Sequence, residues 1–157
     1  MRLSSPPGPP AAASSLPGFG ALIAPEQAPS PTVDAGEEST EVSFARDIRP
    51  LLDRPRDDPS GPGCGGCHYA TNSSHVGIDL GGMDLTTLGA LRRGGATSGE
   101  DVVVAGDPSA SVIVQKIRGT YPFGSRMPRG GPPYWAEEEI DLFERWIAEG
   151  AKGADPE

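Results

Sequence analysis

The sequence predicts an all-α domain with long irregular connections, and three observations support this fold class. Apolar residues recur at helical spacing in four segments, residues 43–54, 84–95, 106–119 and 136–153. Residues 101–106 form the one strand-like run, which is too short to found a sheet. Hydrophobic residues make up 36% of the 157 residues and aromatic residues 6%, so the core is thin for one built from side chains alone. A large apolar cofactor would complete such a core.

The first 41 residues are predicted to be a disordered tail or a weak export leader. They contain eight prolines, interspersed with serine, alanine and glycine, and show no sustained periodicity. Such a segment cannot bury enough apolar surface to offset its chain entropy. A mildly apolar run at residues 16–25 is interrupted by a proline and two glycines, so it is a poor export signal and too short to span a bilayer. We expect the folded domain at residues 42–153, with no membrane span.

The first helical segment contains Pro50, and the second is bounded by recognisable end signals. Because proline lacks an amide proton and restricts the residue before it, we expect a kink or a new first turn at Pro50. Thr86 is the predicted N-cap of the second helix and Gly94 is its predicted stop. The apolar faces of these two helices are predicted to consist of Phe44, Ile48, Leu51, Leu52, Leu88 and Leu91.

The third and fourth helical segments have similar signals. In the third, Asp107 is the predicted N-cap, Pro108 occupies the first turn, and Gly119 ends the helix. The fourth begins with three glutamates, which the helix dipole favours near an N-terminus, and Gly150 is its expected stop. The predicted apolar faces consist of Ile113, Val114, Ile117, Ile140, Leu142, Phe143, Trp146 and Ile147.

The only two cysteines of the chain stand three positions apart, and a histidine directly follows the second. If residues 64–68 form a helical turn, Cys64, Cys67 and His68 project from one face. Two thiols placed in this way can form thioethers with the two vinyl groups of a haem while the imidazole reaches the iron from the same side. This C-x-x-C-H pattern is the signature of covalent c-type haem attachment, and we expect one haem per chain.

A zinc site and a redox dithiol are the alternative chemistries for this motif. Tetrahedral zinc needs four ligands, and the chain offers only His68 and His75 beside the two cysteines. Because His68 directly follows Cys67, binding of both to one zinc ion would strain the geometry. A catalytic dithiol is expected in a βαβ setting, which does not surround this motif. A disulfide between residues three apart would close too small a loop to add much stability.

The iron of a haem electron carrier takes a second axial ligand, usually a methionine thioether. Met127 lies in a glycine- and proline-rich loop before the last helix, from which its side chain can cross the far face of a haem. Met83 follows His68 closely and is predicted to pack as an apolar filler. His75 stands too soon after His68 to reach round the ring easily. We therefore predict Met127 as the distal ligand, with Met83 and His75 as alternatives.

Six segments of this chain resemble, in order, the cytochrome c domain of the planctomycete type: FARDIRPLL, CGGCH, GMDLTTLGALRRGG, GDPSASVIVQKIRG, RMPRGGPP and EEEIDLFERWIAEGAKG. The resemblance covers residues 42–153. It implies a class I-like c-type cytochrome fold, with helices around a covalently bound haem and with the first and last helices crossing at one edge of it. It also implies Cys64 and Cys67 as thioether sites, His68 as the proximal iron ligand and Met127 as the distal ligand.

These observations favour a mono-haem c-type cytochrome that carries single electrons, rather than an enzyme that converts a substrate. One alternative is a haem enzyme or a gas or redox sensor with an open sixth coordination site. Another is a haem-bearing module associated with a larger redox assembly.

The charge of the chain constrains its partners. A net charge of −9 argues against unaided binding to nucleic acid or to an anionic membrane. The expected partners are redox proteins that dock through a small, transient interface. Arg126 and Arg129 flank Met127, so we expect a neutral or mildly basic docking edge. Since haem attachment of this kind normally takes place outside the cytoplasmic membrane, we expect a periplasmic or otherwise exported protein.

Overall fold

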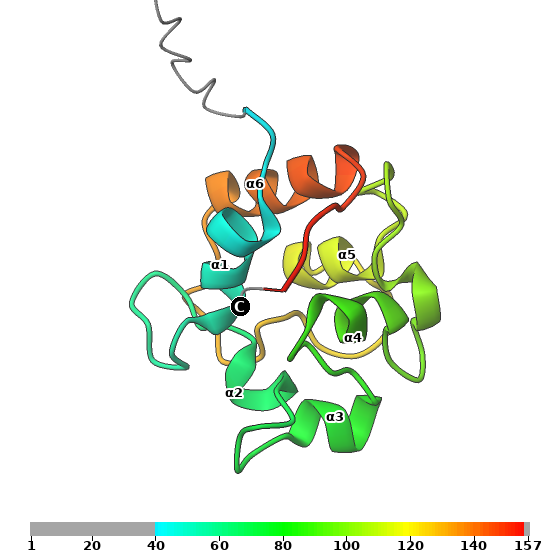
Figure 1. Ribbon diagram of the computed structural model, residues 1–157. Coiled ribbons are helices and arrows are strands. Elements are labelled where there is room, and N and C mark those ends of the chain that lie inside the picture. Colours follow the sequence, from blue (N-terminus) through cyan, green and yellow to red (C-terminus); the bar gives the residue numbers. More distant parts are fainter. Residues whose placement is uncertain (1–39, 156–157) are drawn as a thin grey trace, which may run out of the picture. The chain divides into compact units, whose positions relative to one another are not determined.

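The computed structural model describes residues 40–155, so almost all of the predicted tail at residues 1–41 lies outside the described residues. Within the described range the chain is helical and forms no strand, which confirms the all-α class. Figure 1 shows α1 and α6 at one end of the domain, α2 and α3 at the other, and α4 and α5 between them. The elements are the π-helix η1 (Phe44–Ile48), α1 (Arg49–Asp53), α2 (Gly65–His68), α3 (Val76–Gly81), α4 (Leu88–Arg93), the 3₁₀-helix η2 (Gly99–Val102), α5 (Val112–Arg118) and α6 (Glu137–Ala148).

The first predicted helix divides into η1 and α1. The side-chain oxygen of Ser43 caps η1 by accepting a hydrogen bond from the amide of Arg46 at 3.3 Å. Pro50 lies in the first turn of α1, where an amide proton is not needed. The new first turn that the sequence predicts at Pro50 is therefore confirmed.

The predicted N-cap of α4 is wrong by one residue. Thr87, not Thr86, caps the helix, because its hydroxyl oxygen accepts from the amide of Ala90 at 3.0 Å. The hydroxyl of Thr86 instead accepts from the amide of Ala70 at 2.9 Å, which ties the start of α4 to the segment after α2. The predicted stop is confirmed, since Gly94 is the C-cap with φ of 67°.

Helix α5 begins later than the sequence predicts. Asp107 caps only an isolated turn, in which its carboxylate accepts from the amide of Ala110 at 3.0 Å. The N-cap of α5 is Ser111, whose fully buried hydroxyl donates to the carbonyl of Asp107 at 2.8 Å and accepts from the amide of Val104 at 2.9 Å. This buried hydrogen bonding sets where the helix begins. Gly119 is the C-cap in the left-handed conformation, as predicted.

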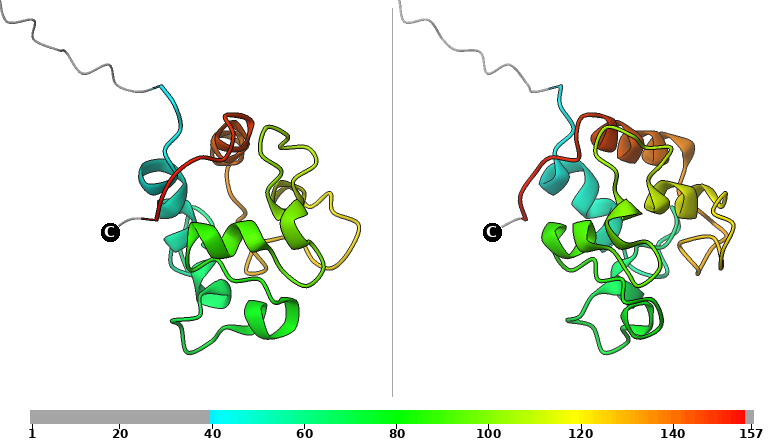
Figure 2. Two further views of the ribbon diagram at one scale, coloured as in Figure 1. Left: turned by 45° about the vertical axis from the view of Figure 1, so that its right-hand side comes forward. Right: turned by 90° about the vertical axis from the view of Figure 1, so that its right-hand side faces the viewer.

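Four aromatic side chains form the centre of the core between η1 and α6. The ring centroids of Phe44 and Trp146 are 5.3 Å apart, those of Phe143 and Trp146 are 5.4 Å apart, and those of Trp135 and Phe143 are 6.1 Å apart. Each of these residues is at most 3% exposed. Elements η1 and α6 pack against each other, and both views of Figure 2 show them at the same end of the domain. This contact agrees with the packing of the first and last helices that the family resemblance implies.

Helix α6 matches its prediction, with three glutamates in its first turn and Gly150 just beyond its end. The N-cap of α6 is Ala136, whose side chain cannot accept a hydrogen bond. The Glu139 carboxylate instead accepts from the amide of Ala136 at 3.0 Å. Arg118, at the end of α5, donates to three carboxylates of α6, and two of them, Glu144 and Glu137, raise the pKa of its guanidinium. These acceptors are Glu137, Asp141 and Glu144.

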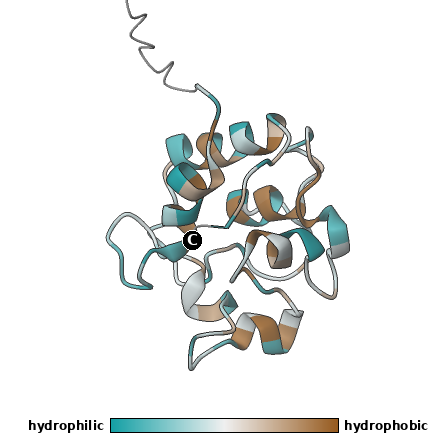
Figure 3. Ribbon diagram, viewed as in Figure 1, coloured by the Kyte–Doolittle hydropathy of each residue, from teal (hydrophilic) through white to brown (hydrophobic). Residues whose placement is uncertain are grey.

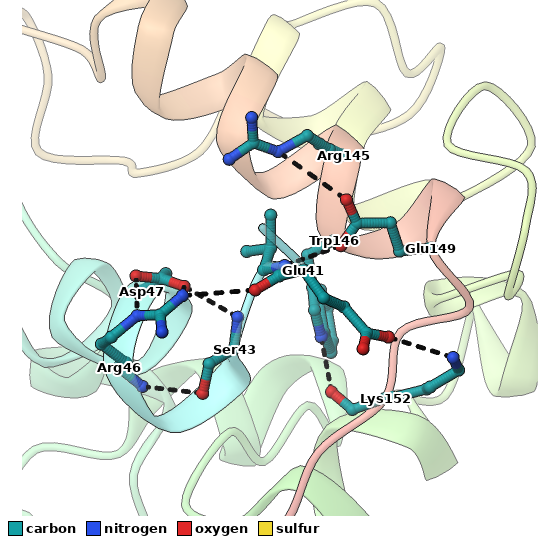
Figure 4. A network of polar contacts seen from close by, with 9 residues as sticks. Glu41, Ser43, Arg46, Asp47, Arg145, Trp146, Glu149 and Lys152 are labelled. Carbon is teal, nitrogen blue, oxygen red and sulfur yellow. Dashed lines mark hydrogen bonds and ion pairs between the residues drawn. The ribbon is translucent and has the colours of Figure 1, made fainter. Parts of the chain in front are cut away.

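The chain enters the domain beside the end of α6 (Figure 4). The amide of Val42 donates to the Glu149 carboxylate at 2.7 Å, and Lys152 pairs with Glu41 at 3.0 Å. The indole of Trp146 donates to the carbonyl of Lys152 at 2.8 Å, so the aromatic core is joined to the same junction. This junction lies at the end of the domain away from α2 and α3.

Candidate haem site

The C-x-x-C-H motif forms the short helix α2. The amides of Cys67 and His68 both donate to the carbonyl of Cys64, at 3.1 and 3.0 Å. The amide of Cys64 donates to the carbonyl of Leu52 at 2.9 Å, which anchors the turn to α1. A Cβ atom added at Gly63 would lie 2.8 Å from that same carbonyl oxygen, so glycine is required for the close approach. The helical turn predicted for residues 64–68 is therefore present and held in place by α1.

A cavity of about 810 Å³ lies beside α2. This volume falls within the range of ligand sites, roughly 300–1,000 Å³. Its lining includes Cys64, Cys67, His68, Met83 and Met127, and both thiols are free. The structure thus brings the predicted thioether sites and both predicted iron ligands to one space, although Met127 comes from a distant loop.

Exposed apolar side chains give a test of whether a large apolar group fits this cavity. In the range 40–155, the large hydrophobic residues that are exposed are Val76 at 43%, Leu80 at 78% and Phe123 at 66%, and all three line the cavity. Apolar side chains gathered around a cavity are expected where a large apolar ligand covers them. Figure 3 shows α3, which carries two of these residues, as strongly hydrophobic at the edge of the domain. The lining therefore fits a haem, the large apolar cofactor that the sequence calls for.

His68 is oriented by its second ring nitrogen. Its Nδ1 lies 2.9 Å from the carbonyl oxygen of Met83. Because a carbonyl can only accept, Nδ1 carries the proton and the lone pair of Nε2 is left for a metal ion. This is the arrangement that an imidazole ligand to iron requires, and it involves the backbone of Met83 rather than its side chain.

The loop that carries Met127 is held against the end of α5 by two basic side chains, Lys116 of α5 and Arg126 of the loop itself. The amide of Met127 donates to the carbonyl of Lys116 at 2.9 Å. The ammonium of Lys116 donates to the carbonyls of Phe123 at 2.5 Å and Ser125 at 3.3 Å, and burial lowers its pKa. Arg126 turns inward, donates to the carbonyl of Ile117 at 2.7 Å and stacks on Tyr134. The sequence does not predict these roles, because the hydrogen-bond acceptors are backbone carbonyls, which no local residue pattern identifies.

The charges around the cavity are of one sign. Arg56, Lys116 and Arg129 line it, and none of the lining residues that the structure describes is acidic. The cavity is thus basic within a chain whose net charge is −9. A basic lining suits a haem, which carries two propionate carboxylates.

The alternative chemistries of the motif gain no support from its surroundings. Burial raises the pKa of the Cys64 thiol to about 12, whereas catalytic dithiols have a lowered thiol pKa. Within residues 40–155, no group of three or more His, Cys, Asp or Glu side chains is placed to hold a metal ion. His75, the alternative distal ligand, does not line the cavity and instead pairs with Asp79 at 3.1 Å.

Residues 64–130 match the protein family described as Planctomycete cytochrome C. No curated protein and no solved structure shows a significant match to the chain. No helix in the described part of the chain is long and apolar enough to cross a membrane. The matched residues include the C-x-x-C-H motif, the cavity-lining helix α3 and the Met127 loop. Residues 64–130 are therefore similar to the planctomycete cytochrome c family, and this similarity indicates a c-type cytochrome domain with an electron-transfer role.

Proposed function

We propose that this chain is a mono-haem cytochrome c in which His68 and Met127 are the two axial ligands of the iron. The observation that carries the proposal is the meeting of Cys64, Cys67, His68 and Met127 around one cavity. Each thiol adds across one vinyl group of the haem, so that its sulfur bonds to one vinyl carbon and its hydrogen passes to the other. The addition balances without an oxidant or a leaving group.

The position of Met83 supports Met127 as the distal ligand. Because the carbonyl of Met83 lies at Nδ1 of His68, the backbone of Met83 is behind the imidazole, on the side away from Nε2. A distal ligand approaches from the direction in which Nε2 points. Met127 lines the cavity from the separate loop after α5, which suits that approach.

The residues around the cavity favour the reduced state. The haem supplies a one-electron Fe(III)/Fe(II) couple. A neutral thioether from Met127 and apolar neighbours such as Leu80 and Ile113 both disfavour the additional positive charge of Fe(III). We therefore expect a positive reduction potential and an electron carrier rather than an enzyme that converts a substrate.

The basic rim of the cavity suggests how a partner docks. Arg56 and Arg129 are exposed at the cavity, whereas Arg126, which the sequence places at the docking edge, is turned inward. An acidic redox partner would be steered to this rim through a small, transient contact. Arg129→Glu is expected to slow reduction by such a partner at low salt, and the difference from the wild type is expected to shrink as salt screens the charges. Equal rates at low salt would place docking elsewhere.

An exported location follows from the same proposal. Covalent attachment of haem to a C-x-x-C-H motif in this family normally takes place outside the cytoplasmic membrane, so we propose a periplasmic or otherwise exported protein. Fractionation of cells that produce the full chain, with haem staining of each fraction, tests this location.

Two methionine substitutions test the axial ligands in holoprotein from a host that attaches haem c. Met127→Ala is expected to abolish the red absorption band of methionine-ligated ferric haem, to lower the reduction potential and to let carbon monoxide bind the ferrous form. Met83→Ala is the matched control. It is expected to leave these three properties unchanged and to cost about 1–3 kcal/mol of unfolding free energy through lost packing.

The reverse result, in which Met83 controls the spectrum, would make the ligand assignment wrong while leaving the covalent attachment intact. If neither substitution changes the spectrum and the wild-type ferrous form already binds carbon monoxide, the chain is instead a haem enzyme or sensor with an open sixth site.

A further inference from the structure

Gly77, the second residue of α3, lies directly against the imidazole of His68. A Cβ atom added at Gly77 would lie 2.5 Å from Nδ1 and 2.7 Å from Nε2 of the ring. It would also lie 2.4 Å from Cε1, the atom between the two nitrogens. Such similar distances to all three ring atoms place it over the face of the imidazole, because an approach in the ring plane would leave both nitrogens clearly farther away than Cε1. Atoms in contact normally stay roughly 3.5–4.0 Å apart, so no side chain fits between α3 and the ring.

The same segment also holds the edge of the ring. The carbonyl of Met83, just beyond α3, lies 2.9 Å from Nδ1 of His68. The amide of Met83 donates to the carbonyl of Gly77 at 3.4 Å, so the two contacts with the imidazole are joined through one backbone hydrogen bond. Rotation of the ring would break the contact at Nδ1, and movement off its plane would meet the backbone at Gly77.

Gly81 lies one helical turn further along α3 and provides a direct contrast. A Cβ atom added there would meet no atom within 4 Å, and neither Gly77 nor Gly81 has a positive φ. Backbone conformation therefore requires glycine at neither position, and alanine is the better helix former at both. The two positions differ in the contact with His68.

We propose that Gly77 is a positioning residue for the proximal iron ligand: its bare backbone fixes the imidazole of His68 so that Nδ1 stays on the Met83 carbonyl and Nε2 faces the cavity. The inference rests on the proposed role of His68. Alanine at Gly77 would tilt the ring or push α3 away, and either change weakens the hydrogen bond at Nδ1. An imidazole without that bond is a weaker donor to iron.

The test compares Gly77→Ala with Gly81→Ala in the full-length holoprotein, with nitric oxide as the probe. Nitric oxide bound to ferrous haem gives a distinct five-coordinate spectrum when the histidine bond breaks. Gly77→Ala is expected to favour displacement of His68 by roughly 10–100-fold, the usual effect of losing an outer-shell partner of a metal ligand. It is also expected to raise the reduction potential, because the weaker donor stabilises Fe(III) less. Gly81→Ala is expected to match the wild type in both measurements.

Helix content by circular dichroism and haem staining establish whether both variants fold and carry haem. If they do, and their nitrosyl spectra and potentials are equal, the inference about Gly77 is overturned. If Gly77→Ala does not fold, the Nδ1 proton of His68 is followed by NMR in the wild-type ferrous holoprotein. It is expected to exchange slowly with solvent because the ring is held on the Met83 carbonyl, and rapid exchange would overturn the inference. A wild type that shows no histidine-ligated haem would instead overturn the proposed function.

Discussion

The two ends of this domain are built in different ways. The aromatic half, defined as η1, α1, Trp135 and α6, has a core in which Phe44, Phe143 and Trp146 are at most 1% exposed. The cavity half, defined as α2, α3 and the loop at residues 120–130, leaves Leu80 78% exposed. Its described contacts are mainly backbone hydrogen bonds and close approaches at glycine. The first half completes its core with its own side chains, whereas the second is arranged around a cavity whose lining fits a haem.

This difference explains how a chain with only 6% aromatic residues folds. Four of its aromatic side chains are concentrated at one end of the domain, where burial of each stabilises the fold by roughly 1.5–3 kcal/mol. At the other end we expect the proposed haem to take the place of side chains. Its covalent attachment would then contribute to folding as well as to function, because it would keep the apolar group in the cavity half.

The largest effect is expected when covalent attachment is removed. Cys64→Ala combined with Cys67→Ala is expected to abolish haem staining on a denaturing gel and to leave a largely unfolded chain. Hydrogen exchange is expected to show that any remaining protection lies in the aromatic half, because its core does not depend on the haem. A double variant that stays compact, with protected amides in α2 and α3, would show that the haem is not needed to complete the core.

The aromatic half is tested by Trp146→Ala in the holoprotein. The indole of Trp146 is fully buried, contacts two aromatic rings and donates to the carbonyl of Lys152. Its loss is expected to cost about 3–5 kcal/mol of unfolding free energy, measured by urea denaturation, with the haem spectrum preserved below the transition. A loss of spectrum without a loss of stability would contradict the separation of the two halves.

The cavity half is tested by Leu80→Ala, also in the holoprotein. An exposed side chain at a protein surface usually contributes within about 0.5 kcal/mol. If the haem covers Leu80, however, truncation removes buried methyl and methylene groups, and we expect a cost of about 1–2 kcal/mol in the same urea measurement. A cost indistinguishable from that of a surface substitution would show that the cofactor does not extend over α3.

The sequence predicts the aromatic half better than the cavity half, and the reason is physical. The apolar stripe of α6 and the turn at Pro50 are local patterns, and both are confirmed. Helix α3 was not predicted, because it is only six residues long and two of them, Gly77 and Gly81, are glycines, which are poor helix formers. The cap at Thr87 was missed because Thr86 has an equally suitable hydroxyl, which the fold uses to contact Ala70.

The candidate site likewise contains residues that the sequence predicts and residues that it does not. The residues proposed to carry its chemistry are predicted from one motif and from loop composition, because thioether and axial ligands require particular residue types, and the structure places these residues around one cavity. The residues that hold them were not recognised. The roles of Gly77 and Lys116 depend on tertiary contacts, with the ring of His68 and with loop carbonyls, that no local pattern specifies.

The smallest expected effect concerns the ion pair at the edge of the aromatic half, between Arg54 and Glu139. Hydrogen bonding from Arg54 lowers the pKa of the Glu139 carboxyl from its ordinary value of 4.5. A lowered pKa in the folded state stabilises the fold above the unfolded pKa, and this contribution is lost as the pH falls below about 4.5 and through the folded pKa. Glu139→Gln removes the titration but keeps a side-chain oxygen for the amide of Ala136.

We therefore expect Glu139→Gln to cost about 1 kcal/mol of unfolding free energy at neutral pH and progressively less as the pH falls below 4.5. Urea denaturation at a series of pH values, with wild type and variant side by side, measures this convergence. Glu138→Gln is the matched control, because it removes one charge from the same helical turn at an exposed position. The unfolding free energies of the two variants could instead differ from that of the wild type by the same constant amount at every pH. The ion pair between Arg54 and Glu139 would then contribute no more than any single negative charge in this helical turn. The ion pair between the end of α1 and α6 would then add nothing to the aromatic packing between η1 and α6.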